Sequence, residues 1–208
     1  MTDFEIHQLE KTDITKIASI HKSSLPDDFL PSLGMDFLEK IYYPAILFGK
    51  SSKTFVAYRK KIPAGFVVVS LNSKLMVNEI ISYRKILFFF YLLKASLSSL
   101  KMLKMVLGII FSGSLSYEKS DEGEIYTIAV DYAYRGQGIG RLLVDKAEEY
   151  LRINNLQGIM IKTLLSNHDW INFFIKNGWT ISSKIKISSK EYVFLTKSFL
   201  NPVNQLKI

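Results

Sequence analysis

Arg135-Gly136-Gln137-Gly138-Ile139-Gly140 is the stretch that decides the fold of this chain. It follows the apolar run 125–130 and opens a helical pattern over 141–151. A strand, a glycine-rich turn and a helix N-terminus direct several backbone N–H groups at one point, with the positive end of the helix dipole behind them. Glycine has no Cβ, so an anion can approach the main chain closely. The stretch therefore predicts a diphosphate site.

Three kinds of glycine turn compete for this stretch. A Walker loop would close on Gly-Lys-Ser/Thr, whereas this chain has Gly140-Arg141-Leu142. A dinucleotide fingerprint needs G-x-G-x-x-G, and the spacing of the three glycines does not supply it. The remaining pattern is Arg/Gln-x-x-Gly-x-Gly/Ala after a strand that ends in Val130. A glycine turn without a ligand stays open as the alternative.

With this pattern the chain resembles the GCN5-related N-acetyltransferase superfamily, whose signature holds the pyrophosphate of acetyl-CoA. The resemblance runs from about Glu124 to Trp179 and is weaker over Phe4 to Ser70. It implies an α/β (α+β) fold in one domain, 1–208, with a mixed, mostly antiparallel seven-stranded sheet flanked by helices. It also implies transfer of acetyl from acetyl-CoA, as co-substrate, to a primary amine of a small molecule by direct attack in a ternary complex.

The composition limits the chemistry. The 208 residues contain no cysteine, which excludes disulfides, a thiolate nucleophile and cysteine-ligated zinc. Three scattered histidines lack metal-ligand spacing, so we expect no metal. The net charge of +8 suits an anionic small molecule, and the basic residues form short groups rather than the stripe that nucleic-acid binding needs. Residues 1–5 lack a signal-peptide pattern, which predicts a cytoplasmic location.

Hydrophobic periodicity and turn residues predict the elements. The predicted strands are 4–9, 54–58, 64–71, 125–130, 158–164, 180–187 and 191–197. The predicted helices are 12–23, 35–48, 141–153 and 168–176.

A helical insertion, about 77–114, separates the third and fourth predicted strands. Its longest apolar stretch, 86–93, is too short to span a membrane. Lysines then recur among apolar residues at helical spacing. Three interpretations stay open: helices that pack on the domain or on a second subunit of a homodimer, a basic amphipathic surface over 86–111 lying on an anionic membrane, or a lid over the acceptor pocket.

The resemblance assigns the cofactor contacts. The amides of Gly136, Gln137, Gly138, Ile139, Gly140 and Arg141 would take the pyrophosphate. The main chain of Ile128, Ala129 and Val130 would pair with pantetheine where the fourth strand splays from the fifth. Arg135 would reach a phosphate or be a surface arginine, and Asn167 would contact the cofactor, cap helix 168–176, or do both.

Glu124 is the predicted general base, because many relatives carry a glutamate at the start of this strand. Strand alternation predicts that Glu124, Tyr126 and Ile128 share one face. Burial could bring the pKa of the carboxyl towards the working pH. A solvated carboxylate is the alternative reading, and Glu118 and Glu122, in a predicted loop, are further candidates.

The general acid departs from the family pattern. Relatives often carry a tyrosine seven residues after the asparagine, where this chain has Phe174. Phenylalanine cannot donate a proton. A free thiol has a pKa of about 8.5, so a thiolate can leave unaided. Otherwise Tyr126, Tyr132, Tyr134 or a water substitutes, or the chain is a CoA-binding regulatory protein with weakened catalysis.

The acceptor is indicated only by residues 24–34 and the aromatic helix after them. This region is similar to bacterial acetyltransferases associated with surface polysaccharides, which favours an amino sugar over a protein lysine. If the insertion binds a membrane, the acceptor would be a lipid-linked sugar.

Overall fold

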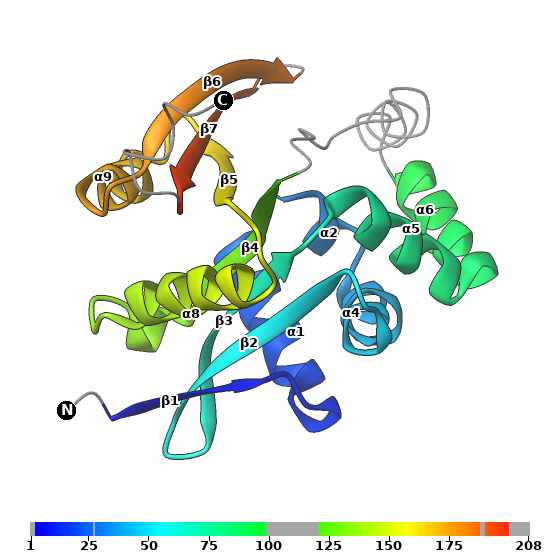
Figure 1. Ribbon diagram of the computed structural model, residues 1–208. Helices are drawn as coiled ribbons and strands as arrows, with labels where there is room; N and C mark the ends of the chain where they lie inside the picture. The colour runs from blue at the N-terminus through cyan, green and yellow to red at the C-terminus, as the bar shows by residue number, and fades with distance from the viewer. Residues whose placement is uncertain (1–2, 27, 99–120, 188–189, 200–208) are drawn as a thin grey trace.

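The computed structural model describes residues 3–26, 28–98, 121–187 and 190–199 of the 208-residue chain. These residues form one seven-stranded sheet in the order β1-β2-β3-β4-β5-β7-β6 (Figure 1). Every neighbouring pair is antiparallel except β4 and β5, so the predicted mixed, mostly antiparallel sheet is confirmed. The strands are β1 (Phe4–Gln8), β2 (Ser52–Arg59), β3 (Ile62–Ser70), β4 (Glu122–Val130), β5 (Gly158–Leu164), β6 (Thr180–Ile187) and β7 (Lys190–Ser198).

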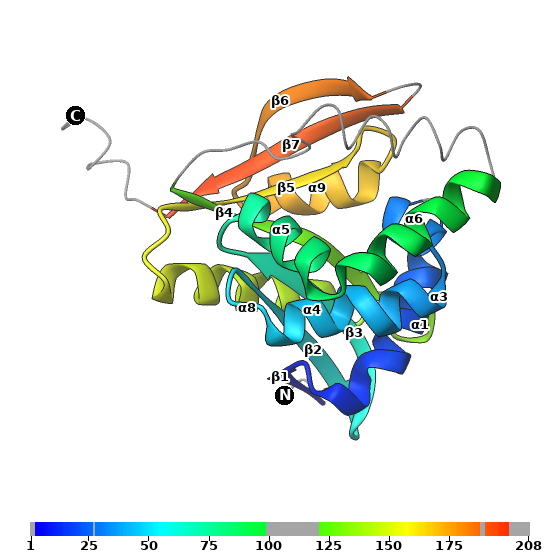
Figure 2. The ribbon, with the colours of Figure 1, turned by 90° about the vertical axis from the view of Figure 1, so that its right-hand side faces the viewer.

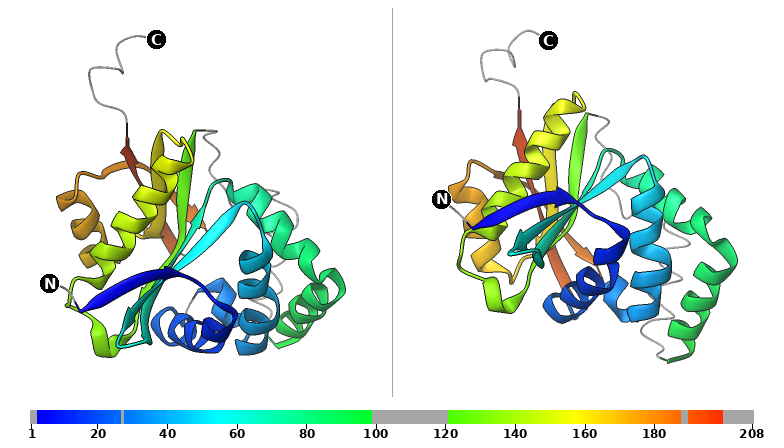
Figure 3. Two further views of the ribbon diagram at one scale, coloured as in Figure 1. Left: turned by 60° about the horizontal axis from the view of Figure 1, so that its bottom comes forward. Right: turned by 90° about the horizontal axis from the view of Figure 1, so that it is seen from below.

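Helices cover both faces of the sheet and create two apolar cores (Figures 2 and 3). One face carries α1 (Ile14–Ser24), α2 (Phe29–Ser32), α3 (Met35–Phe37), α4 (Tyr43–Phe48), α5 (Ser73–Tyr83) and α6 (Lys85–Ser98). The other carries α8 (Ile139–Ile153) and α9 (His168–Lys176). In α8 the buried residues recur at helical spacing, as an amphipathic helix on a sheet requires.

The predicted helix 35–48 is interrupted. Between α3 and α4, residues Leu38–Tyr42 form a turn of π-helix. Pro44 stands in the first turn of α4 and has no N–H to donate to a carbonyl four residues back. A widened turn accommodates this missing bond. Phe37, Tyr42 and Tyr43 of this segment are fully buried in the core, as their clustering indicated, whereas Phe48 at its end is exposed.

A bulge in β4 corrects the predicted alternation. Val68 pairs with Thr127 and Val69 pairs with Ile125, so Tyr126 has no partner of its own on β3. An extra residue shifts the following side chains by one position. Tyr126 accordingly packs on the core under α1–α6, whereas Ile128 belongs to the core under α8. The prediction that Ile128 shares a face with Glu124 and Tyr126 is therefore wrong.

The insertion begins earlier than predicted. Helix α5 starts at Ser73, not near 77, and Asn72 caps it by accepting a hydrogen bond of 3.0 Å from the Leu75 amide. Helix α6 follows directly, and residues 99–114 of the predicted insertion lie outside the described residues. In the part of the chain that the structure describes, no helix combines the length and apolar character needed to cross a bilayer.

His21 is a buried histidine of α1. Only 1% of it is exposed, and its Nδ1 lies 2.9 Å from the hydroxyl of Tyr43. Burial lowers the pKa of His21 from 6.5 to about 4. Between these values the unfolded chain carries a proton on this ring and the folded chain does not.

We therefore expect the free energy of unfolding to fall as the pH falls from 6.5 to about 4. The share due to His21 should reach about 3 kcal/mol at the acid end of this window. Urea unfolding across the pH range measures it. His21→Leu should flatten the slope, whereas His7→Leu, at an exposed position on β1, should keep it. An unchanged slope in His21→Leu would contradict the assignment.

Candidate functional site

The sheet opens between β4 and β5. These strands pair only from Glu122 opposite Gly158 to Ile125 opposite Ile161. Beyond that point β5 keeps its pairing with β7, and β4 keeps its pairing with β3 as far as Val130. In the described part of the chain, the second half of β4 has no strand on its other edge, and β5 to β7 turn away from it (Figure 1). This is the splay that the resemblance implied.

The peptide groups of Ile128 and Val130 face this open edge. The Asp131 amide donates to the Ala64 carbonyl at 2.9 Å, which directs Asp131 towards β3. Alternate residues of an antiparallel pair point to opposite sides, so Ala129 also faces β3 and its neighbours face away. The Val130 carbonyl agrees, because it accepts from Ser24 Oγ at 3.3 Å and from Arg135 Nε at 3.2 Å.

The glycine turn joins this open edge to α8. Gly136 and Gly138 have φ of +74° and +82°, a left-handed conformation that strains residues with a Cβ. Gly138 is the N-cap of α8, and no side chain caps this helix. The Arg141 amide bonds back to the Gly138 carbonyl at 3.0 Å. The amides of Ile139 and Gly140 come too early in the helix for an internal partner, which leaves a site for an anion.

Gly140 has a packing role. A Cβ built on Gly140 would lie 3.2 Å from Cη2 of Trp170 on α9. The missing side chain lets the indole ring lie against the first turn of α8. The third glycine of the motif thus fixes how closely α8 and α9 approach.

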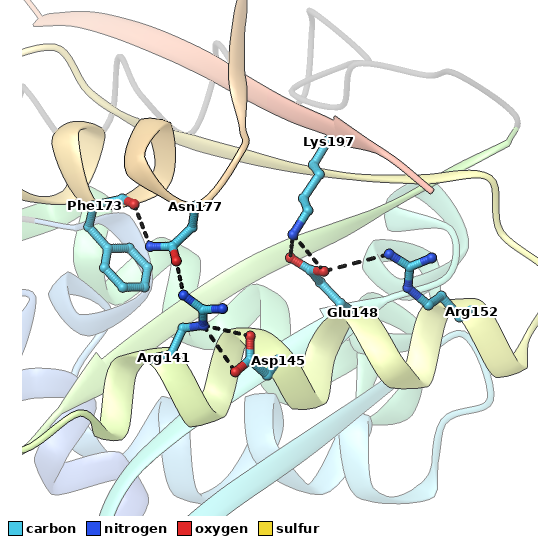
Figure 4. A network of polar contacts seen from close by, with 7 residues as sticks. All are labelled: Arg141, Asp145, Glu148, Arg152, Phe173, Asn177 and Lys197. Carbon is cyan, nitrogen blue, oxygen red and sulfur yellow. Dashed lines mark hydrogen bonds and ion pairs between the residues drawn. The ribbon is translucent and has the colours of Figure 1, made fainter. Parts of the chain in front are cut away.

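The polar side chains of the glycine turn, 135–141, make contacts with other residues of the protein. Arg135 lies over the Tyr132 ring, 5.5 Å from its centroid, and Gln137 Oε1 accepts from Arg59 at 3.4 Å. Arg141 binds Asp145 at 2.9 and 3.0 Å and donates to Asn177 beyond α9 (Figure 4). The Arg141 guanidinium therefore ties the two helices together.

A second ion-pair group fixes α8 on the sheet. Glu148, only 8% exposed, accepts from Lys197 Nζ of β7 at 2.8 and 2.9 Å (Figure 4). Arg152 lies 3.8 Å from the same carboxylate. Breaking one partner of a buried pair leaves an uncompensated charge. The contact holds the turn at the start of α8 in position relative to the opened strands.

Glu124 lies in the paired half of β4, opposite Met160 of β5, and is partly exposed. Its carboxylate accepts a hydrogen bond from Ser73 at the start of α5. Burial raises the pKa of Glu124, while the Ser73 hydroxyl and the charge of Lys162 on β5 oppose that rise. A carboxylate with a raised pKa can accept a proton near neutral pH. The other two candidates differ: Glu122 lies in β4 and not in the predicted loop, and Glu118 lies outside the described residues.

The tyrosines near the opening are not equivalent. Tyr126 follows Glu124 on the same core face, and its pKa is raised by burial and by the Glu124 charge. Tyr132 and Tyr134 lie in the turn before the glycines. Tyr132 is 84% exposed, and Tyr134 packs edge-on against Phe4. Phe174 is fully buried between Trp170 and Trp179. Of these candidates for a general acid, only Tyr126 interacts with Glu124.

Asn167 leaves α9 without a side-chain cap. It occupies the N-cap position, but its carboxamide makes no capping bond and instead donates to Thr163 Oγ1 at 3.4 Å. The predicted capping of α9 by the Asn167 side chain is therefore wrong.

Ser73 and Lys162 are site residues that sequence reasoning missed. The signal for Ser73 was present, because Asn72-Ser73 directly after an apolar strand is a helix-start pattern. Its contact with Glu124 joins residues far apart in the chain, so no local pattern predicts it. Lys162 acts through charge across the β4–β5 pair. Among the described residues, no group of histidines and carboxylates is placed to hold a metal ion.

Comparison with known proteins finds similarity to acetyltransferases. The model of the acetyltransferase (GNAT) family matches residues 15–179. The mycothiol acetyltransferase of Nocardia farcinica is 32% identical over 74 residues, which are 36% of this chain and 24% of that protein. The amino-acid acetyltransferase of Mycobacterium tuberculosis is 30% identical over 91 residues, 44% of this chain and 49% of that protein. The matched region thus spans no more than half of either relative.

Solved structures share the fold. YncA from Salmonella typhimurium, determined with its cofactor acetyl-CoA, has a TM-score of 0.60 and 13% identity, with 96% of this chain and 95% of that chain covered. At this identity the likeness concerns the fold.

Proposed function

This chain belongs to the acetyltransferase (GNAT) family, and we propose that it transfers an acetyl group from acetyl-CoA to a primary amine of a small molecule. One observation carries the proposal. The uncapped N-terminus of α8, with two left-handed glycines before it, adjoins the half of β4 that has an open edge. An anion site next to unpaired strand groups fits a ligand with a diphosphate followed by an amide-containing arm.

The residues present fit this ligand. The amides from Gly136 to Gly140 would hold the diphosphate, and the peptide groups of Ile128 and the Val130 amide would pair with pantetheine, since the Val130 carbonyl already accepts from Ser24 and Arg135. Asn167 makes no capping bond, and its carboxamide, which donates to Thr163 Oγ1 at 3.4 Å, would turn to the cofactor on binding. The Arg141 guanidinium is bound to Asp145 and Asn177, so its contribution would be to position α8.

Glu124 would act as the general base. The thioester supplies an electrophilic carbonyl and a thiolate leaving group, so the chain needs no nucleophile of its own. Glu124 takes a proton from the attacking amine, directly or through a water, and Ser73 orients the carboxylate. Tyr126, which follows Glu124 on the same core face, is our candidate donor to the leaving sulfur in place of Phe174, although its raised pKa makes it a weak acid.

An amino sugar is the acceptor that we propose. The support is the resemblance of residues 24–34 and the following aromatic helix to acetyltransferases of surface polysaccharides. Release of free thiol from acetyl-CoA should be followed with separate panels of amino sugars, amino acids, polyamines and peptide N-termini. Turnover confined to the non-sugar panels would contradict the amino-sugar assignment alone.

Phe174 favours one competing function, a CoA-binding protein without turnover. Phenylalanine stands where relatives often carry the hydroxyl that protonates the sulfur, and it is fully buried. The same experiment separates the two functions. Tight binding of CoA with no thiol release from any panel would support the competing function, and no binding of CoA would refute both.

Ser73→Ala tests how the base is tuned. The Ser73 hydroxyl lowers the pKa of Glu124, so its removal should raise that pKa further. Because the base acts as the carboxylate, the acid limb of the kcat/KM–pH profile should move to higher pH, with the plateau at high pH largely retained. Ser82→Ala, at an exposed position of the same helix, is the matched control. A profile that drops uniformly at all pH values would assign Ser73 a purely structural role.

A further inference from the structure

Helix α6 lies at the outer edge of the molecule (Figures 1 and 2), and several of its apolar residues are exposed. Its inner side is buried, with Tyr91, Leu92 and Ala95 in the core. Its outer side presents five large apolar residues, which we call the α6 outer face: Ile86 (89% exposed), Phe89 (45%), Phe90 (56%), Leu93 (61%) and Leu97 (81%). Their spacing of three and four places them on one side of the helix.

Five large exposed apolar residues on one side of a helix are more than an ordinary protein surface shows. Single exposed apolar residues are common, whereas contiguous apolar patches mark binding surfaces. Residues 84–87 and Phe90 also line a shallow depression whose surface is almost entirely apolar. From Ile86 to Leu97 the strip extends for about 17 Å along the helix. Exposure of this apolar strip to water is energetically unfavourable.

The charged residues of α6 and of its neighbours in the sequence are all basic, while Asp36 of α3 interacts with Lys94. Lys85 and Lys94 are exposed and lie on opposite flanks of the α6 outer face, and Arg84 precedes the helix. From Ile80 to Tyr117 the sequence contains no Asp or Glu, and the whole chain carries a net charge of +8. An apolar face flanked by basic residues on both sides is the pattern of a helix that lies in the plane of an anionic membrane surface.

We propose that the α6 outer face docks on an anionic lipid bilayer, with the apolar residues in the interfacial region and the flanking basic residues at the headgroups. A second copy of this chain fits less well. Two such faces would bring basic flanks together without an acidic residue of α6 to pair with them, and like charges oppose association. The proposal stands independently of the acetyl transfer.

Flotation of the full chain with lipid vesicles tests the proposal. We expect binding to phosphatidylcholine vesicles that contain phosphatidylglycerol, weak binding to phosphatidylcholine alone, and loss of binding at high salt. The double variant Phe90→Ser/Leu93→Ser should lower the partition coefficient about tenfold or more, since two large apolar side chains are removed. Lys85→Glu should lower it about fivefold or more.

The matched control is Ile62→Ser/Ile153→Ser, at two exposed apolar positions (51% and 69%) away from α6, which should bind as the parent does. Thermal unfolding checks that each variant is folded. Equal partition of the α6 variant and the parent would overturn the proposal, as would equal binding to neutral and anionic vesicles. A dimer in sedimentation that the α6 variant dissociates would assign the face to a second copy.

Discussion

Glu124→Gln should lower kcat by about a hundredfold or more while leaving the affinity for acetyl-CoA within about twofold of the parent value. The amide keeps the size of the side chain and can still accept a hydrogen bond from Ser73. It cannot accept the proton of an attacking amine. The loss should therefore fall on turnover, which thiol release at saturating acetyl-CoA measures, and calorimetry measures the cofactor affinity.

Glu122→Gln is the matched control for this experiment. Glu122 lies two residues earlier in β4, before the bulge, so it carries the same chemical group on the same strand. Its replacement should change kcat only slightly. If both variants lose turnover equally, or if Glu124→Gln loses cofactor affinity in step with turnover, Glu124 is not the general base.

The sequence predicted the sheet and its connections because their signals are local. The apolar runs, the helical periodicity of α8 and the glycine turn each depend on residues close together in the chain. Those signals correctly place all seven strands, whereas the opening beside β4 was implied by the family resemblance. The boundaries were less exact. The apolar pattern placed the start of the insertion near residue 77, whereas helix α5 begins at Ser73.

What the sequence could not predict depends on contacts across the fold. The bulge at Tyr126 arises from the pairing of β3 with β4, and it reverses the face of Ile128 without any change in composition. The contact between Ser73 and Glu124 joins residues 51 positions apart. Likewise, the sequence motif suggests only that Gly140 faces a phosphate. The position of Trp170 shows that Gly140 also allows α8 and α9 to pack closely.

Gly138→Ala should weaken acetyl-CoA binding about tenfold or more, because it acts on the amides that we assign to the diphosphate. Gly138 has φ +82°, which an L-residue adopts at a cost of about 1–2 kcal/mol. A Cβ there meets no protein atom within 4 Å, so the substitution causes no internal clash. The alanine relieves its strain by rotating the turn, and the N–H groups then no longer converge. Calorimetric titration with acetyl-CoA measures the loss.

Gly34→Ala separates this effect from backbone strain in general. Gly34 has φ +99°, its added Cβ also meets nothing within 4 Å, and it lies before α3, away from the turn. Both variants should lose stability, Gly34→Ala at least as much, since its ψ of 164° lies in a region essentially confined to glycine. Only Gly138→Ala should lose affinity for acetyl-CoA. Equal affinities in the two variants would mean that the amides at the start of α8 do not hold the diphosphate, and the proposed cofactor site would have to be abandoned.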